Sequence, residues 1–402
     1  MHMNEETKRF ITEHGKEDIF TLKLKYRNNS EVNIDLAIRQ ITGKQKIKSK
    51  VPLFYHTEDL LYPVQLSLEQ SSSESTAMYK STLCEGNSLV DLTGGFGVDC
   101  CFMSEHFQEV TYVERQPELC ELARHNFKTL HKDHIRVVNS ETENYLTEMG
   151  PVDWIYLDPA RRGSGGKKVV LLSDCEPDVS ALSSLLLEKA NRVMIKLSPM
   201  MDITAATTAL PHTSEIHIIS VENECKEILL ILNQTIQDNK KIITLNIGKH
   251  YENQLFDYYL TEETTAAVAF TSEIKKYLYE PNASVMKSGA FKLTGSYFKL
   301  CKLHNNTHLY TSNELVPQFP GRVFKVVKTW GHSKNEMKEM AQQLPTANIT
   351  TRNYPISVDE LRKKLKIKEG GDTYLFACTL NDEHKAIIET KKLSGQHPGI
   401  GL

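Results

Sequence analysis

The feature that most constrains the fold is a regular alternation of strand-like and helix-like segments between Val90 and Leu232. Five short apolar strands are expected, at residues 89–92, 110–114, 135–139, 154–158 and 193–197. The segments between them carry the i, i+3, i+4 apolar spacing of helices, as in Pro117–Leu130 and Val179–Ala190. This alternation predicts a parallel sheet that is covered by helices on both faces.

The alternation of strand and helix patterns ends at "EIHIISVENECKEILLILN". Two further strands, at residues 216–221 and 228–232, follow one another too closely for a helical crossover. The second must therefore run antiparallel to the first. The sequence predicts five parallel strands, then a sixth strand, then an antiparallel seventh.

A glycine-rich turn, "LVDLTGGFGVDC", follows the first strand and indicates a ligand that approaches the backbone closely. A P-loop would need Gly-Lys-Ser/Thr, and no Lys follows Gly97. A dinucleotide fingerprint that starts at Gly95 would need its third Gly where Cys100 stands, so that match is poor. The pattern D-x-G/T-x-G-x-G of S-adenosylmethionine (SAM) sites fits best, with Asp91, Thr93, Gly95 and Gly97.

Acids at the ends of the next strands support this interpretation. Glu114 ends the second strand, where a carboxylate can accept both ribose hydroxyls. Glu141 follows the third strand, where an acceptor for the adenine amino group is expected. Asp158 ends the fourth strand, at the carboxyl edge that holds the reactive groups of open α/β folds.

With these residues the region resembles the class I SAM-dependent methyltransferases, whose seven-stranded Rossmann-like α/β sheet has the order 3-2-1-4-5-7-6. The segments "LEQSSSESTAMYK", "DPARR", "IKLSPMMD" and "NYPISVDELRKKLKIKEGGDTYLFA" are similar to a bacterial, Bacteroidetes-type family of RNA methyltransferases. That family carries ferredoxin-like and THUMP-like domains behind the catalytic domain. The resemblance implies SAM as cofactor and structured RNA, rRNA or tRNA, as substrate and partner.

Four domains are expected from the pattern and the resemblance together. They are a mainly helical segment (1–80), the methyltransferase domain (81–235), a ferredoxin-like α+β domain (236–330) and a THUMP-like α+β domain (331–402). Ser71 and Glu74 form a capping-box pattern that predicts a helix start before the first strand. Ser357 predicts the start of a helix in the tail.

Methyl transfer is an in-line displacement that needs alignment and the removal of a proton from the acceptor. We assign that chemistry to Asp158, Pro159 and Arg161. Ala160 and Arg161 replace the Pro and Tyr of "DPPY"-type enzymes, so the aromatic platform for an adenine N6 target is missing. An Arg suits a phosphate or a carbonyl edge, or else a structural salt bridge. Contacts to substrate are expected from Arg162, Lys167 and Lys168 around the Gly-rich loop 163–166.

Weaker cofactor candidates stand beside the turn. Asp99 either reaches the methionine ammonium or favours the first helical turn through the macrodipole. Phe96 either covers the cofactor or fills the core. Gln70 and Thr76 precede the first strand, in a segment that the resemblance places near the methionine end.

The eight cysteines form no C-x-x-C pair, which argues against a zinc site and a disulfide framework and for a reducing compartment. Cys225 stands beside Lys226 between the last two strands of the sheet. It is either a nucleophile for pyrimidine C5 chemistry or an inert thiol. The cysteine that cytosine methyltransferases carry after their fourth strand is absent, because that position is Ala160.

Bulk charge supports no general polyanion binder, because the formal net charge of the 402 residues is −3. No signal-like or membrane-spanning apolar run is present, so we expect a cytoplasmic protein. A methyltransferase that acts on a protein or small molecule, and a non-catalytic SAM-binding protein, are the alternatives. Basic residues gather in three stretches: Lys44, Lys46, Lys48 and Lys50; Arg161, Arg162, Lys167 and Lys168; and Arg362, Lys363, Lys364, Lys366 and Lys368.

Overall fold

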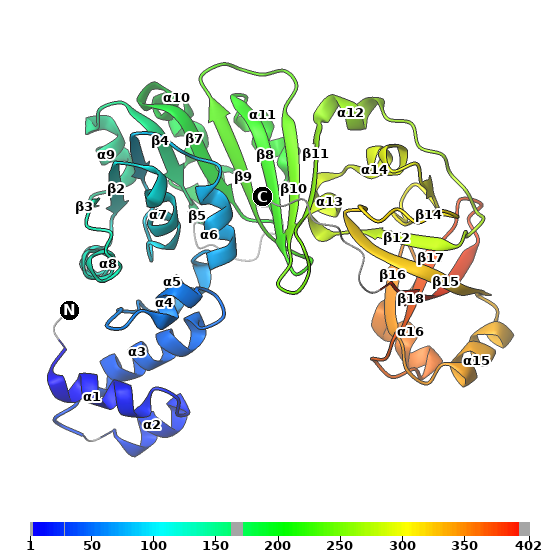
Figure 1. Ribbon diagram of the computed structural model, residues 1–402, viewed down its shortest axis with the longest axis horizontal. Coiled ribbons are helices and arrows are strands. Elements are labelled where there is room, and N and C mark those ends of the chain that lie inside the picture. The colour runs from blue at the N-terminus through cyan, green and yellow to red at the C-terminus, as the bar shows by residue number, and fades with distance from the viewer. Residues whose placement is uncertain (1–2, 28, 162–171, 394–402) are drawn as a thin grey trace. The chain divides into compact units, whose positions relative to one another are not determined.

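The structure, a computed structural model, describes residues 3–27, 29–161 and 172–393 (Figure 1). Contacts divide the chain into two compact units, residues 1–214 with 229–237 and residues 215–228 with 238–402. Within the described ranges, no helix combines the length and the apolar character that a membrane span requires.

Hydrogen bonds order the strands of the larger sheet as β11-β10-β8-β9-β7-β4-β1-β2-β3. The run from β3 to β8 has the predicted order 3-2-1-4-5-7-6, so the α/β fold class is confirmed, but the predicted size of seven strands was wrong because two later strands extend the same sheet. The two further strands, β10 and β11, come from the start of the predicted third domain. The bounds of all nine are β1 (Ser88–Asp91), β2 (Glu109–Glu114), β3 (Ile135–Asn139), β4 (Val152–Leu157), β7 (Ala190–Leu197), β8 (Thr213–Val221), β9 (Glu224–Asn233), β10 (Lys241–Ile247) and β11 (Gln254–Tyr259).

The hairpin between β8 and β9 explains the antiparallel strand. Only Glu222 and Asn223 separate the two strands, and both have a positive φ, 51° and 64°. Two central residues with positive φ are typical of the tight turns that join antiparallel strands. By contrast, β1 pairs in parallel with both β2 and β4.

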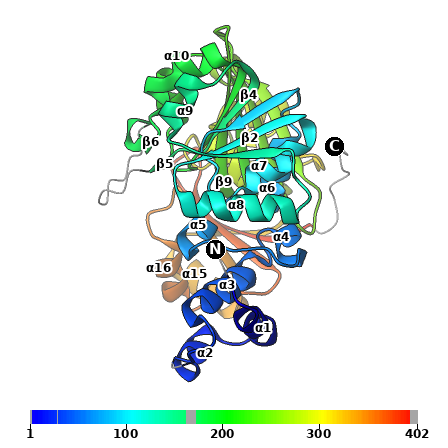
Figure 2. The same cartoon turned by 90° about the vertical axis from the view of Figure 1, so that its left-hand side faces the viewer.

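Helices cover both faces of the sheet in the first unit. Figure 2 shows α6 (Glu74–Ser81) and α7 (Val98–Met103) on one side of the strands and α9 (Thr142–Glu148) and α10 (Val179–Lys189) on the other. Between these layers the central strands are apolar and buried, as at Ile155 and Val193. The strands therefore carry nearly continuous apolar runs, as expected for a parallel sheet. Two further helices of the predicted methyltransferase domain are α8 (Pro117–Thr129) and α11 (Ile203–Ala209).

The segment before β1 is helical, as predicted (Figure 1). Its helices besides α6 are α1 (Glu5–His14), α2 (Ile19–Lys25), α3 (Ile34–Ile47), α4 (Pro52–His56) and α5 (Gln65–Gln70). The N-cap of α6 is Ser73, so the prediction of Ser71 was wrong by two residues. The reason is tertiary: the Glu74 carboxylate accepts a hydrogen bond from the Leu53 N–H at 2.7 Å and so does not close a box with Ser71.

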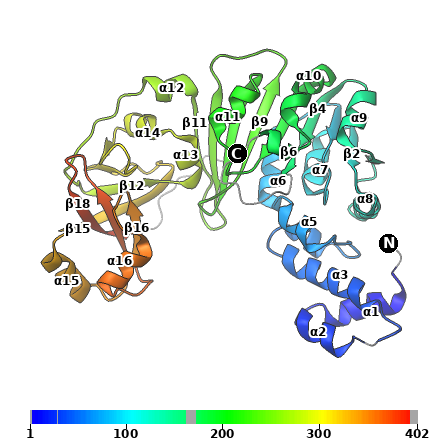
Figure 3. The same ribbon diagram turned by 180° about the vertical axis from the view of Figure 1, so that it is seen from behind.

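The second unit contains a seven-stranded sheet of order β13-β14-β12-β15-β18-β17-β16, with α15 and α16 beside it (Figure 3). Ser357 begins α16 with a capping box, as predicted. Glu280 of β12 is buried and accepts hydrogen bonds from Arg322 and Arg352 at 2.7 and 3.0 Å, which ties three strands together. The elements are β12 (Tyr277–Pro281), β13 (Cys301–Lys302), β14 (Tyr310–Ser312), β15 (Gly321–Gly331), β16 (Asn348–Arg352), β17 (Thr373–Thr379), β18 (Lys385–Lys392), α12 (Leu260–Thr265), α13 (Ala283–Ser288), α14 (Phe291–Tyr297), α15 (Lys334–Gln343) and α16 (Val358–Leu365).

Candidate active site

The glycine turn after β1 has the backbone geometry that its sequence predicts. Gly95 and Gly97 have φ of 55° and 81°, a region that is cheap only for glycine. A Cβ on Gly94 would lie 2.1 Å from the Tyr112 ring, so this position also requires glycine. The turn begins where the buried Asp91 carboxylate accepts the Thr93 N–H at 3.0 Å.

Sheet register brings the predicted acids to the level of this turn. Asp91 pairs with Tyr112 on one side and Tyr156 on the other. Glu114 and Asp158 each stand two residues beyond those partners, so they share the carboxyl edge with the glycine turn. This is the arrangement in which open α/β folds bind ligands.

Glu114 is held in place by two backbone donors. Its Oε2 accepts the Gly95 N–H at 2.9 Å, and its Oε1 accepts the Gln116 N–H at 2.8 Å. A carboxylate oxygen has two lone pairs, so each oxygen keeps one for a further donor. The Tyr112 hydroxyl donates to the Gly95 carbonyl at 2.6 Å and holds the turn against β2. The arrangement suits a pair of ribose hydroxyls.

Asp158 is joined directly to the turn. Its backbone N–H donates to Thr93 Oγ1 at 2.6 Å. Its carboxylate forms an ion pair with Lys196, and its side chain remains 34% exposed, which leaves it accessible to substrate. Lys196 lies near the end of β7, and its side chain is 12% exposed. Sequence reasoning missed Lys196, although a lysine inside the apolar run "VMIKLSP" is a usable signal.

Asp99 carries a buried ion pair. Its Oδ1 lies 3.2 Å from Nζ of Lys80, a fully buried lysine of α6, and its Oδ2 accepts hydrogen bonds from Ser72 and Tyr156, both at 2.7 Å. Burial alone would raise the pKa of Asp99, but the ammonium groups of Lys80 and Lys196 and these hydrogen bonds hold it below its usual value. Within the described residues, no donor makes a well-aligned hydrogen bond to Oδ1, a buried oxygen whose neighbouring cation is Lys80.

The pKa of Asp91 is shifted in the opposite direction from that of Asp99. Full burial raises its pKa well above the usual value, the Thr93 hydrogen bond opposes that rise, and the charges of Asp99, Asp158 and Glu114 add to it. The edge therefore concentrates four acids. Lysines compensate two of them, since Lys80 pairs with Asp99 and Lys196 pairs with Asp158.

The other predicted cofactor residues fall into two groups. Glu141 and Gln70 are exposed, at the start of α9 and the end of α5. Thr76 is buried and bonds to Ser73, which caps α6. Phe96 is buried against Phe54, with ring centroids 5.4 Å apart, which is the core role that the sequence left open.

Beyond Pro159, the chain enters strand β5 (Ala160–Arg161), which pairs with β6 (Cys175–Glu176). Arg115 forms a 2.8 Å ion pair with Glu176 and so ties this ribbon to the residue after Glu114. All three predicted substrate residues, Arg162, Lys167 and Lys168, lie outside the described residues.

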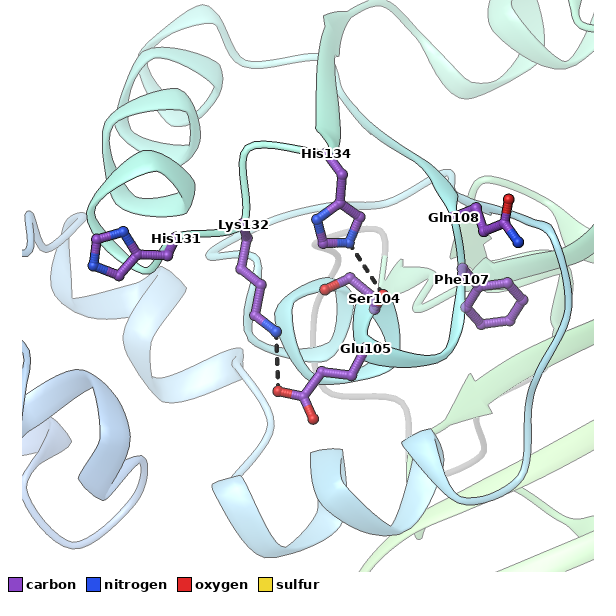
Figure 4. Close-up of a pocket in the computed structure, with 7 residues that line it drawn as sticks. All are labelled: Ser104, Glu105, Phe107, Gln108, His131, Lys132 and His134. Carbon is purple, nitrogen blue, oxygen red and sulfur yellow. Dashed lines mark hydrogen bonds and ion pairs between the residues drawn. The ribbon is translucent and has the colours of Figure 1, made fainter.

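The pocket in Figure 4 lies elsewhere. Its residues come from the segments that precede β2 and β3, at the amino edge of the sheet, opposite the glycine turn. Lys132 pairs with Glu105 at 2.9 Å, and His134 contacts the Ser104 carbonyl at 3.1 Å. These polar side chains are therefore engaged in contacts within the pocket. The pocket is not the predicted site.

Cys225 is half-buried in the other unit. Burial raises its pKa to about 11, so the thiol is protonated at neutral pH. This favours the inert thiol of the two predicted roles. The part of the chain that the structure describes holds no cluster of three or more His, Cys, Asp or Glu side chains suited to a metal ion.

Family models match three stretches of the chain: protein-L-isoaspartate(D-aspartate) O-methyltransferase over residues 16–163, a ferredoxin-like domain over 277–320 and a THUMP-like domain over 321–391. A solved structure from Porphyromonas gingivalis W83, described as that of a candidate methyltransferase, is 30% identical. It has a TM-score of 0.87, over 98% of this chain and 100% of that chain.

Other solved structures are similar over less of the chain. An rRNA methylase from Streptococcus thermophilus is 14% identical with a TM-score of 0.32, over 40% of this chain and 96% of that chain. An O-methyltransferase from Bacillus cereus, in complex with SAH, is 10% identical with a TM-score of 0.31, over 46% and 99%. No curated protein matches the sequence.

Proposed function

This chain belongs to the bacterial methyltransferase family that carries ferredoxin-like and THUMP-like domains, and on that premise we propose that it methylates a base in structured RNA, rRNA or tRNA, with SAM as the methyl donor. The observation that carries the proposal is the single edge at which Glu114, the glycine turn and Asp158 meet, with Asp158 bonded to Thr93.

The residues of this edge fit an adenosine-bearing sulfonium. Glu114 keeps a lone pair on each oxygen for the two ribose hydroxyls. Asp99, which already pairs with Lys80, is the proposed partner of the methionine ammonium, and the exposed Glu141 is the proposed acceptor for the adenine amino group. A Cβ on Gly95 would meet only the Thr93 carbonyl, 3.8 Å away, so the backbone is open to close approach.

SAM supplies an electrophilic methyl group, and the chain supplies alignment and a proton acceptor. Asp158 is the proposed acceptor, because its carboxylate is partly exposed while its backbone is fixed to Thr93. Lys196 holds that carboxylate in one orientation and balances its charge. Pro159 stiffens the step from β4 to the ribbon, and Arg161 lies in that ribbon, next in sequence to the predicted substrate residue Arg162.

RNA is favoured as the substrate by the THUMP-like match over residues 321–391, since the family resemblance links that module to structured RNA. One observation favours a protein substrate instead, namely the isoaspartate O-methyltransferase match over residues 16–163. That match includes Asp158 but ends before Lys196 and before both small domains, so it leaves unexplained the domains that follow the methyltransferase domain.

The test combines binding and product analysis. Calorimetry with the demethylated cofactor should show uptake by the wild type and by Asp158→Asn within about threefold, because Asp158 serves the acceptor. Mass spectrometry of nucleosides from cells with and without the gene should reveal one methylated nucleoside that disappears in the deletion and in cells carrying Asp158→Asn. A labelled protein or metabolite in place of RNA would support the alternative substrates, and binding without any product would support a non-catalytic role.

A further inference from the structure

The helices α3 and α4 present two lysines over one tyrosine. Nζ of Lys44 lies 6.0 Å and Nζ of Lys48 lies 5.7 Å from the centroid of the Tyr55 ring, and the exposed His56 ring stands 5.0 Å from that ring. Three groups that can be positively charged thus gather around a half-buried aromatic side chain. Cations at these distances are attracted to the face of a tyrosine.

The other two lysines of this basic stretch have structural contacts. Lys46 pairs with Glu69 at 3.1 Å. Lys50 donates to the carbonyls of Leu68 and Glu69 at 2.7 and 2.8 Å, at the end of α5. Neither Lys44 nor Lys48 forms an ion pair with any residue that the structure describes. The stretch is therefore divided into two lysines that hold the fold and two that face Tyr55.

Helix electrostatics account only in part for Lys44 and Lys48. A lysine near the C-terminus of α3 is favoured by the macrodipole, which explains a basic last turn. Lys44 and Lys48 are nevertheless one helical turn apart, where like charges repel each other. Tyr55 holds both on one face, so an anion between them would relieve the repulsion.

This face adjoins the cofactor turn through α4. Phe54, the neighbour of Tyr55, is 1% exposed and packs edge-on against Phe96 of the glycine turn, with ring centroids 5.4 Å apart. Tyr62 contacts the same Phe96 ring at 6.2 Å. One short helix therefore contacts the cofactor turn through Phe54 and carries Tyr55 under the two lysines.

We propose that Lys44, Lys48 and Tyr55, with His56 beside them, form a binding face for the phosphate backbone of the RNA substrate. This inference rests on the proposed function, because it needs RNA as the substrate. The two lysines neutralise phosphates, and Tyr55 is a positioning residue that keeps their ammonium groups together. The face brings an RNA contact to the helix that supports the cofactor turn.

The test compares the full-length wild type with Lys44→Gln/Lys48→Gln, using unfractionated bacterial tRNA and fragmented rRNA as probes. Fluorescence anisotropy over a salt series gives the slope of log K against log salt. Losing two phosphate contacts should reduce that slope by about 1.4 to 1.8, from about 0.7 per contact on single strands to about 0.9 on duplexes. Tyr55→Leu should weaken RNA binding severalfold through misplaced lysines.

Lys46→Gln is the matched control, because it removes one exposed charge from the same helix but not from the Tyr55 face. It should leave the slope within about 0.3 of the wild type, and every variant should bind the demethylated cofactor as the wild type does. An equal slope in the double variant would overturn this inference alone. A wild type that binds neither RNA would overturn the proposed RNA substrate. Loss of cofactor binding in the double variant would indicate misfolding. In that case Lys44→Arg/Lys48→Arg tests the inference: it keeps both positive charges, so its salt slope must equal that of the wild type.

Discussion

The backbone N–H of Asp158 donates a hydrogen bond to Oγ1 of Thr93 at 2.6 Å. Thr93 belongs to the glycine turn after β1, and Asp158 follows β4, so this bond joins the proposed cofactor site to the proposed proton acceptor. The register of β1 and β4 brings the two residues together, and the Thr93 N–H is held in turn by Asp91.

Thr93→Val should remove this link while keeping the shape of the side chain. The Asp158 N–H would lose its acceptor, at a cost of about 1 kcal/mol in the free energy of unfolding. A shifted acid should slow methyl transfer by about tenfold to hundredfold, since small misplacements of a catalytic group are costly. Single-turnover kinetics measure the rate and denaturant titration the stability. Thr93→Ser keeps the hydroxyl and should restore most of the rate; equal rates in both variants would contradict the role.

Glu114→Gln should weaken cofactor binding at least tenfold, or about 1.4 kcal/mol. The amide offers one acceptor oxygen where the carboxylate offers two, so either the Gly95 or the Gln116 N–H faces an NH₂ group. Calorimetry with the demethylated cofactor measures the change. Glu109→Gln is the control, because Glu109 is exposed at the start of the same strand. Unchanged affinity in Glu114→Gln would contradict the assignment of Glu114 to the ribose.

Lys80→Met should destabilise the protein by about 3 to 5 kcal/mol, because it leaves the buried Asp99 carboxylate without its cation. Urea unfolding, followed by Trp154 fluorescence in a Trp330→Phe background, measures the loss. Adding Asp99→Asn to Lys80→Met should recover part of it. No recovery would indicate that packing around Lys80, and not the charge pair, dominates.

The same pair predicts an acid dependence of stability. The folded-state pKa of Asp99 is lowered below its ordinary value of about 3.9 by Lys80 and Lys196 against the effect of burial. Its contribution is therefore complete above about pH 4 and disappears as pH falls through the lower folded-state pKa. Asp99→Asn should flatten the stability profile below pH 4, which the same unfolding experiment checks.

Lys302→Met should change how the stability of the second unit depends on alkaline pH. Burial lowers the pKa of Lys302 from 10.5 to about 8, with Glu263 opposing the shift and Lys292 adding to it. Between these values the unfolded chain binds more protons, so wild-type stability should rise with pH from about 8 to about 10.5. The variant should lose this rise. Unfolding at pH 7 and 9.5, followed by Trp330 fluorescence in a Trp154→Phe background, measures it, and an unchanged rise would contradict the assignment to Lys302.

Much of the main sheet could be predicted because its signals are local. The five parallel strands follow from apolar runs separated by helical spacing, and the antiparallel strand from a connection of a few residues between β8 and β9. The shared position of Glu114 and Asp158 also follows, since strands that run in parallel end at the same edge. The pairing of β10 with β8 was not predictable, because it depends on which strand edge remains open.

The capping box illustrates the opposite case. Ser71 and Glu74 satisfy the local pattern, yet Ser73 caps α6 because Glu74 binds the Leu53 N–H, 21 residues away in the sequence. A rule that considers only neighbouring residues cannot predict a contact between residues so far apart in the sequence. Ser357 and Glu360, which have no such competitor, form the box that the sequence predicts.

By itself, the sequence determined the strands of the catalytic sheet, the glycine turn and the acids at the strand ends, because backbone preference and alternation act over neighbouring residues. Only the tertiary structure decided that Lys80 and Lys196 compensate Asp99 and Asp158, and that Phe96 packs on Phe54. Charge compensation and packing join residues far apart in the chain, and their energy depends on the distance and burial that folding creates.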